Sequence, residues 1–139
     1  MTRWPSEKHF ASWLGLAPGT RVSGGKQLSG RTKPSTSRAA AALRMAASSL
    51  HHSQSALGAF FRRMKARVGP PKAITATARK LACLIYRLLR FGTQYVDRGQ
   101  DYYERRYQGH LISHLTRRAK QLGYTLVKAE SPSPASVGV

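Results

Sequence analysis

Residues 72–91, KAITATARKLACLIYRLLRF, carry the clearest structural signal in the chain. At about 100° per residue, the larger apolar side chains of a helix over this stretch fall within one arc of about 140°. Four cations fall within an opposing arc of about 100°. The stretch therefore predicts a helix with one packing face and one cationic face. The apolar set is Ile74, Ala78, Leu81, Leu84, Ile85, Leu88 and Leu89, and the cations are Arg79, Lys80, Arg87 and Arg90.

Shorter amphipathic segments lie on both sides of this helix. Apolar spacing and helix-ending glycines and prolines predict helices over residues 6–14, 37–50, 54–67 and 110–122. The Tyr- and Arg-rich residues 93–108 fit base stacking or an amphipathic packing helix. We predict an all-α domain over residues 1–128, a small bundle of about four to six amphipathic helices, and a disordered tail over residues 129–139.

A Gly-, Ser- and Lys-rich loop near the N-terminus separates the first two predicted helices. It reads GTRVSGGKQLSGRTKPSTS over residues 19–37. Glycines let the backbone approach a phosphate closely, and the cations supply countercharge. The spacing of a Walker loop is absent, and a flexible loop without a ligand remains an alternative.

The charge balance points to a polyanionic partner. The 139 residues contain 24 Lys and Arg against 5 Asp and Glu, a formal net charge of +19. Nucleic acid is the expected partner of so basic a chain, through phosphate contacts and counterion release. A basic protein that binds nucleic acid without catalysis is the main alternative. The candidate contacts are Lys26, Arg31, Lys33, Arg79, Lys80, Arg87 and Arg90.

We expect no membrane partner, because no apolar run approaches the roughly 20 residues that span a bilayer. An anionic membrane surface is the weakest alternative, since the basic faces are spread over helices that also carry packing stripes. The first residues lack a signal-peptide pattern, and the single cysteine, Cys83, suits a reducing compartment. These features predict a cytoplasmic, nucleoid-associated bacterial protein.

Neither a metal site nor a cofactor is expected in this chain. Asp97, Asp101 and Glu104 could share a helix face, but we interpret them as partners of nearby arginines. His51 and His52 fit a polar helix end better than a metal site, because adjacent side chains on a helix diverge by about 100°. Trp13 fits core packing better than a base-stacking platform.

Three segments in order resemble one family of transposases. The first is FASWLGLAP over residues 10–18, similar to the family's F-x-x-W-L-G-L-x-P. The second comprises SGGK (23–26) and GRTK (30–33), followed by Leu43-Arg44 and Ala46-Ala47. The third comprises PKA (71–73) and ARKL (78–81), followed by Tyr86. The resemblance is strongest over residues 10–95. The family comprises insertion-sequence transposases and Piv-type DNA invertases with an N-terminal RuvC-like DEDD domain, described also as bridge-RNA-guided recombinases.

The resemblance implies a serine nucleophile in the S-G-G-K loop, which is Ser23 in this chain. It also implies DNA transposition or site-specific recombination, in cooperation with Mg²⁺ in a DEDD domain. We expect this chain to lack that domain, and Pro34-Ser35-Thr36-Ser37 stands where the family has a Gly-Asn-like pair. We therefore expect an N-terminally truncated remnant that is inactive alone. Its expected partners are DNA and a DEDD domain or full-length transposase in trans, with a guide RNA and self-association as open alternatives.

Overall fold

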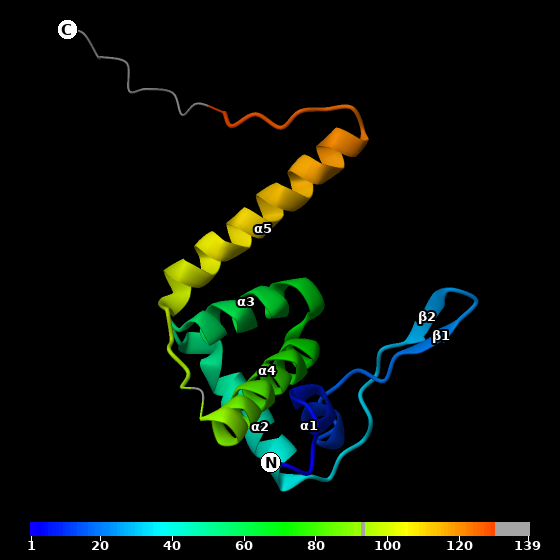
Figure 1. The fold of residues 1–139 in the computed structure, drawn as a ribbon, viewed down its shortest axis with the longest axis vertical. Helices are drawn as coiled ribbons and strands as arrows, with labels where there is room; N and C mark the ends of the chain where they lie inside the picture. Colours follow the sequence, from blue (N-terminus) through cyan, green and yellow to red (C-terminus); the bar gives the residue numbers. More distant parts are fainter. Residues whose placement is uncertain (93, 130–139) are drawn as a thin grey trace, which may run out of the picture. The chain divides into compact units, whose positions relative to one another are not determined.

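The computed structural model describes residues 1–92 and 94–129, and the chain divides into two compact units, Met1–Glu104 and Arg105–Val139. The mostly helical class predicted from the sequence is confirmed (Figure 1). The predicted tail, apart from Ala129, lies outside the described residues. The elements in order are α1 (Glu7–Trp13), β1 (Arg21–Ser23), β2 (Lys26–Ser29), α2 (Arg38–Ser49), the 3₁₀ helix η1 (Leu50–His52), α3 (Ala56–Val68), α4 (Pro70–Phe91) and α5 (Gly99–Gln121).

The helices of the first unit begin where local chemistry satisfies their free N–H groups. Ser37 precedes α2 and its hydroxyl accepts from the Ala40 amide, and Ser55 does the same for Gly58 at the start of α3. Pro70 opens α4, at a position where a missing N–H costs little. Ser6 occupies the predicted cap position of α1, but its hydroxyl pairs with His9 Nδ1 at 2.7 Å instead of a backbone amide.

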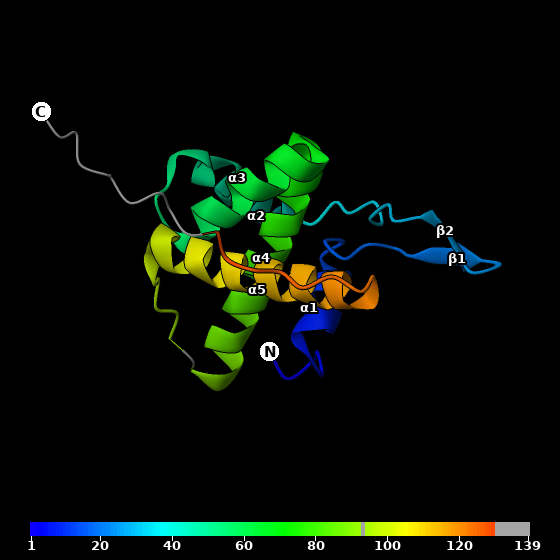
Figure 2. The same cartoon turned by 90° about the horizontal axis from the view of Figure 1, so that it is seen from above.

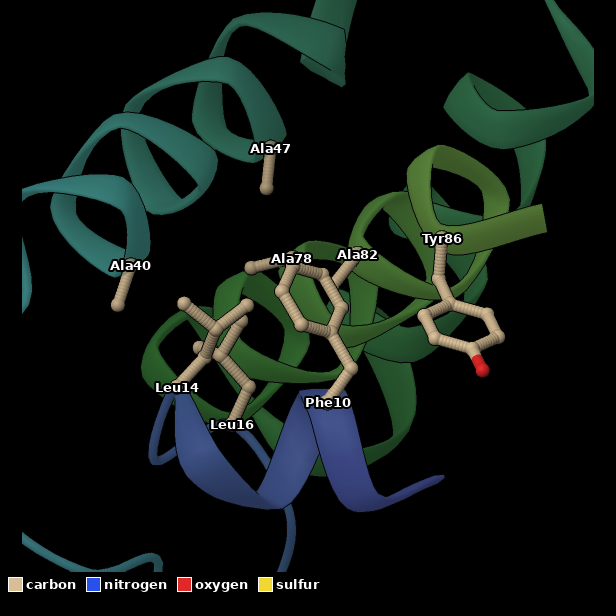
Figure 3. Packing of buried hydrophobic residues seen from close by; sticks show 8 residues of the cluster. All are labelled: Phe10, Leu14, Leu16, Ala40, Ala47, Ala78, Ala82 and Tyr86. Carbon is tan, nitrogen blue, oxygen red and sulfur yellow. The ribbon is translucent and has the colours of Figure 1, made fainter. Parts of the chain in front are cut away.

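Helix α4 is the central element of the first unit and packs against α1, α2 and α3. Its contact surface is built from small side chains, which let neighbouring backbones approach closely. Figure 3 shows the main core cluster, in which side chains of α1 meet Ala78, Ala82 and Tyr86 of α4. The cluster comprises Phe10, Leu14, Leu16, Ala40, Ala47, Ala78, Ala82 and Tyr86.

The predicted packing face of α4 is wrong in its second half. Ile74 and Leu81 do pack against the core cluster, but Leu88 and Leu89 are 47% and 63% exposed. The buried residues of α4 run from Ala73 to Tyr86 and are mainly alanines. Because α1, α2 and α3 all approach α4 closely, the buried face of α4 is centred on small residues. Leu88 and Leu89, in the last turns of α4, therefore lie outside this face.

Tyr86 ties α4 to the N-terminal segment, because its hydroxyl donates to the Trp4 carbonyl at 2.7 Å. We expect Tyr86→Phe to lower the free energy of unfolding by about 0.5–1.5 kcal/mol, since the ring still fills its site and one hydrogen bond is lost. Urea unfolding followed by circular dichroism measures the change. The control is Tyr124→Phe at a 71% exposed position, which should leave stability unchanged. Equal stability of Tyr86→Phe and the parent would contradict the role of this bond.

The last helix is longer than predicted. Helix α5 begins at Gly99 and continues through Gly109, so residues 99–108 of the Tyr- and Arg-rich segment and the predicted helix over residues 110–122 form one element. Its apolar side chains are largely solvent-exposed, with Leu111, Ile112 and Leu115 between 43% and 56% exposed. Among the described residues, no helix has the length and apolarity that crossing a membrane requires.

Candidate nucleic-acid interface

The predicted N-terminal loop contains a β-hairpin with Ser23 beside its turn. Strands β1 and β2 pair antiparallel, with Ser23 opposite Lys26. Gly24 and Gly25 form the turn at φ 56° and 75°, the left-handed conformation that a two-residue hairpin turn of this kind requires. This hairpin was not predicted from the sequence, although a Gly-Gly pair between two short strand-like runs is its signal.

Ser23 and Lys26 face the same side of the hairpin, because directly paired residues of an antiparallel ladder share a face. Their Cβ atoms are therefore expected about 4.5–5.5 Å apart. Both residues are exposed, and no hydrogen bond engages the Ser23 hydroxyl among the described residues. The serine is thus open to solvent and has a cation as its cross-strand neighbour.

The two segments that flank the hairpin pack closely against each other. The Gly19 amide donates to the Arg31 carbonyl at 3.0 Å, and Pro18 bridges to Thr32. A Cβ at Gly15 would lie 2.6 Å from Ser35 Cβ, so only glycine allows this approach. Figures 1 and 2 both show the hairpin extending away from helices α1 to α4.

Three predicted phosphate contacts lie on the hairpin and the residues that flank it, residues 19–33, which we call the arm. Lys26 is at the tip, Arg31 is at the base and Lys33 follows on the segment that leads to α2, and all three are exposed. The register changes between Arg21 and Val22, which places Leu28 opposite no residue of β1. Such a bulge increases local twist. The arm therefore presents cations at several points along its length.

The predicted cations of α4 are partly occupied by contacts within the protein. Arg87 forms a two-pronged ion pair with Glu7 of α1, and this pairing holds the pKa of Glu7 below its ordinary value. Lys80 Nζ lies 4.0 Å from the centroid of the Phe60 ring. The Arg90 guanidinium donates to the Met1 carbonyl at 3.4 Å, and Arg79 is half-buried. The row predicted to follow a phosphate backbone is thus interrupted by internal contacts.

Asp97 and Glu104 accept hydrogen bonds from backbone and side-chain groups of the protein. Asp97 lies before α5 rather than on it, and its Oδ1 accepts from the Ala56 and Gly99 amides, both at 3.0 Å. Glu104 accepts from Gln100 Nε2 at 2.9 Å. Over residues 1–92 and 94–129, no group of three His, Cys, Asp or Glu side chains could hold a metal ion. The carboxylates within these described ranges therefore do not fit a Mg²⁺ site.

His51 and Cys83 are the two remaining candidates for metal binding or nucleophilic chemistry. His51 is in η1, with Nε2 3.0 Å from Lys65 Nζ, and the lysine charge lowers the pKa of His51. Cys83 is half-buried, and burial raises the pKa of its thiol despite the cations nearby. Neither group has the setting of a metal ligand or an activated nucleophile.

Comparison with known families finds one similarity, and it includes the hairpin segment. Residues 1–62 match a family model of transposases, and this match covers α1, the hairpin, α2, η1 and the first residues of α3. The family is the transposase IS116/IS110/IS902 family, which confirms the resemblance to insertion-sequence transposases. Comparisons with curated proteins and with solved structures gave no significant match. The third resembling segment, residues 71–86, lies outside the matched range and stays a prediction.

Proposed function

We propose that this chain binds DNA and supplies Ser23 as the nucleophile of a DNA recombination reaction that an acidic domain completes in trans. The observation that carries the proposal is the position of Ser23 inside the transposase match, exposed beside a hairpin turn and opposite Lys26. A projecting, cationic arm is a suitable shape for reaching a DNA backbone, because phosphates attract exposed Lys and Arg side chains.

The proposed reaction is a transesterification at phosphorus. The Ser23 hydroxyl loses its proton to a general base as Oγ forms a bond to the phosphorus of a DNA phosphodiester. The bond from phosphorus to one deoxyribose oxygen breaks, and that sugar oxygen leaves as a hydroxyl after protonation. Negative charge grows on the phosphoryl oxygens, and Lys26, Arg31 and Arg21 are the nearby cations that would stabilise it.

The residues that the structure describes place no general base beside Ser23. The Ser23 hydroxyl has no hydrogen-bond acceptor among the described residues, and the metal-binding carboxylates expected of the family are not present there. We therefore assign these groups to a DEDD domain or a full-length transposase acting in trans. The same observation favours the alternative function, a basic nucleic-acid-binding protein without catalysis.

A trapping assay separates the two functions. The purified chain is mixed with element-end DNA, guide RNA and a separately expressed DEDD domain, and covalent adducts are detected on denaturing gels. We expect an adduct from the parent chain, none from Ser23→Ala, and an undiminished adduct from Ser29→Ala, a matched serine on β2. If the adduct is lost when guide RNA is omitted, the guide RNA is also a partner of this chain.

Two results of the trapping assay would contradict the assignment of Ser23 as the nucleophile. No adduct under any condition, together with salt-sensitive DNA binding that is unchanged in Ser23→Ala, would leave the non-catalytic function and overturn the assignment of Ser23. An adduct of equal yield from Ser23→Ala would move the nucleophile to another residue.

A further inference from the structure

An aromatic cluster joins the N-terminal segment to α1 and α4. The Trp4 ring lies 5.0 Å from the Phe10 ring and 4.9 Å from the Trp13 ring, centroid to centroid. Phe10 also stacks against Trp13 at 6.2 Å with an interplanar angle of 21°, and lies 5.9 Å from Tyr86. Figure 3 shows the Phe10 and Tyr86 side chains within the core.

Trp13 differs from the other members of this cluster because it points outward. Phe10 and Tyr86 are 8% and 2% exposed, whereas Trp13 is 53% exposed. The sequence prediction that Trp13 is a core residue is therefore wrong. Two aromatic neighbours nevertheless hold its ring in place. The result is a supported indole with much of its surface open to solvent.

The support beneath Trp13 is itself fixed. The Trp4 carbonyl accepts from the Tyr86 hydroxyl, and the Arg3 guanidinium lies 5.9 Å from the Trp4 ring centroid. A ring that is already ordered loses little conformational entropy when a flat ligand stacks on it. This rigidity distinguishes Trp13 from a freely rotating surface side chain.

The electrostatic setting of the cluster favours an anion-bearing ligand. Arg3 and Lys8 are exposed, and Arg90 contacts the Met1 carbonyl. Glu7 is the one carboxylate between residues 1 and 96, and Arg87 neutralises it. Aromatic faces combined with cations that attract the backbone are the usual elements of single-stranded nucleic-acid binding.

We propose that Trp13 is a stacking platform for an unpaired nucleobase of single-stranded DNA or RNA, with Arg3 and Lys8 attracting its phosphates. This inference rests on the proposed function only in that the chain binds nucleic acid, and it is independent of Ser23. A base within a duplex has both faces covered by its neighbours, so duplex DNA would gain nothing from Trp13 away from its ends. The platform therefore gives the chain a preference for strands that have been opened.

Anisotropy of labelled oligonucleotides tests the proposal in the full chain, with oligothymidylate, oligouridylate and a duplex of equal length as probes. Alanine substitution of a base-stacking aromatic corresponds to about a 5- to 150-fold loss of affinity. We expect Trp13→Ala to weaken single-strand binding in this range and to change duplex binding less than about twofold. Trp13→Phe should retain part of the affinity, because the phenyl ring still stacks.

Two further measurements serve as controls for the effect of Trp13→Ala on binding. Met45→Ala removes a 73% exposed side chain on α2 and should change neither affinity. Trp4 and Trp13 are the two tryptophans of the chain, so single strands should quench more fluorescence in the parent than in Trp13→Phe. The oligothymidylate and oligouridylate arms show whether DNA or RNA gains more from the platform.

Three results would overturn the inference. Trp13→Ala that binds single strands as tightly as the parent removes the platform. An equal loss for single strands and duplex shows a general surface effect instead of stacking. A parent chain that binds no probe overturns the proposed function as well, which separates that failure from the first two.

Discussion

Gly58→Ala is expected to lower the free energy of unfolding by about 3 kcal/mol or more, although alanine normally stabilises a helix relative to glycine. Gly58 is in the first turn of α3, and a Cβ there would lie 2.1 Å from the Ser53 carbonyl oxygen and 3.0 Å from the Leu50 carbonyl oxygen. Both obstacles are backbone atoms, so no side-chain rotation relieves the clash. Moving Ser53 would also disturb its bond from the Arg62 guanidinium at 2.7 Å.

Gly109→Ala provides the matched control within the same chain. Gly109 lies inside α5, and a Cβ at this position would meet nothing within 4 Å. We expect increased helicity and a local gain of about 0.5–1 kcal/mol. Urea unfolding and far-ultraviolet circular dichroism measure both variants. If Gly58→Ala proved as stable as the parent, the connection between η1 and α3 would have to be looser than the structure describes.

Replacing Lys26, Arg31 and Lys33 together is expected to lower the affinity for DNA more than the other variants described above. In the triple variant Lys26→Gln, Arg31→Gln, Lys33→Gln, each lost phosphate contact should reduce the slope of log K against log salt by about 0.9 for duplex DNA. Three contacts give a reduction of about 2.7 and a marked weakening at low salt. Titrations of duplex DNA at a series of salt concentrations measure the slope.

The control for this variant uses an ion pair that the sequence alone would have counted as a DNA contact. Arg87→Gln combined with Glu7→Gln removes a cation and its partner together and leaves the net charge unchanged. We expect the salt slope of this double variant to equal that of the parent. A larger drop in slope for the double variant than for the hairpin variant would place the DNA on α4 instead of the arm.

Local sequence patterns predicted most of the helical framework. Helices α1 to α4 match the expected segments closely, because glycine, proline and serine mark their ends within a few residues. Ser23 came from the resemblance to transposases, and no periodicity or spacing would have singled it out. The hairpin around it has exposed residues on both strands, so it lacks the alternating burial by which a strand is usually recognised.

Contacts between residues distant in the chain could not be predicted from local sequence patterns. Arg87 meets Glu7 across 80 positions, and Asp97 meets the Ala56 amide across 41. A helical projection of residues 72–91 gives the direction of each side chain around the helix axis. It does not show which side of this helix the other helices will cover. Leu88 and Leu89 therefore looked like core residues and proved exposed, as did Trp13 on α1.

The Asp97 carboxylate is an acceptor that the beginnings of two helices share. Its Oδ1 receives the Ala56 amide of α3 and the Gly99 amide of α5, and the Gln100 amide donates to the nearby Gln54 carbonyl. Withdrawal of that side chain would leave both amides without this acceptor in a single event. We therefore expect the Ala56 and Gly99 amides to open together, so that their hydrogen exchange is coupled.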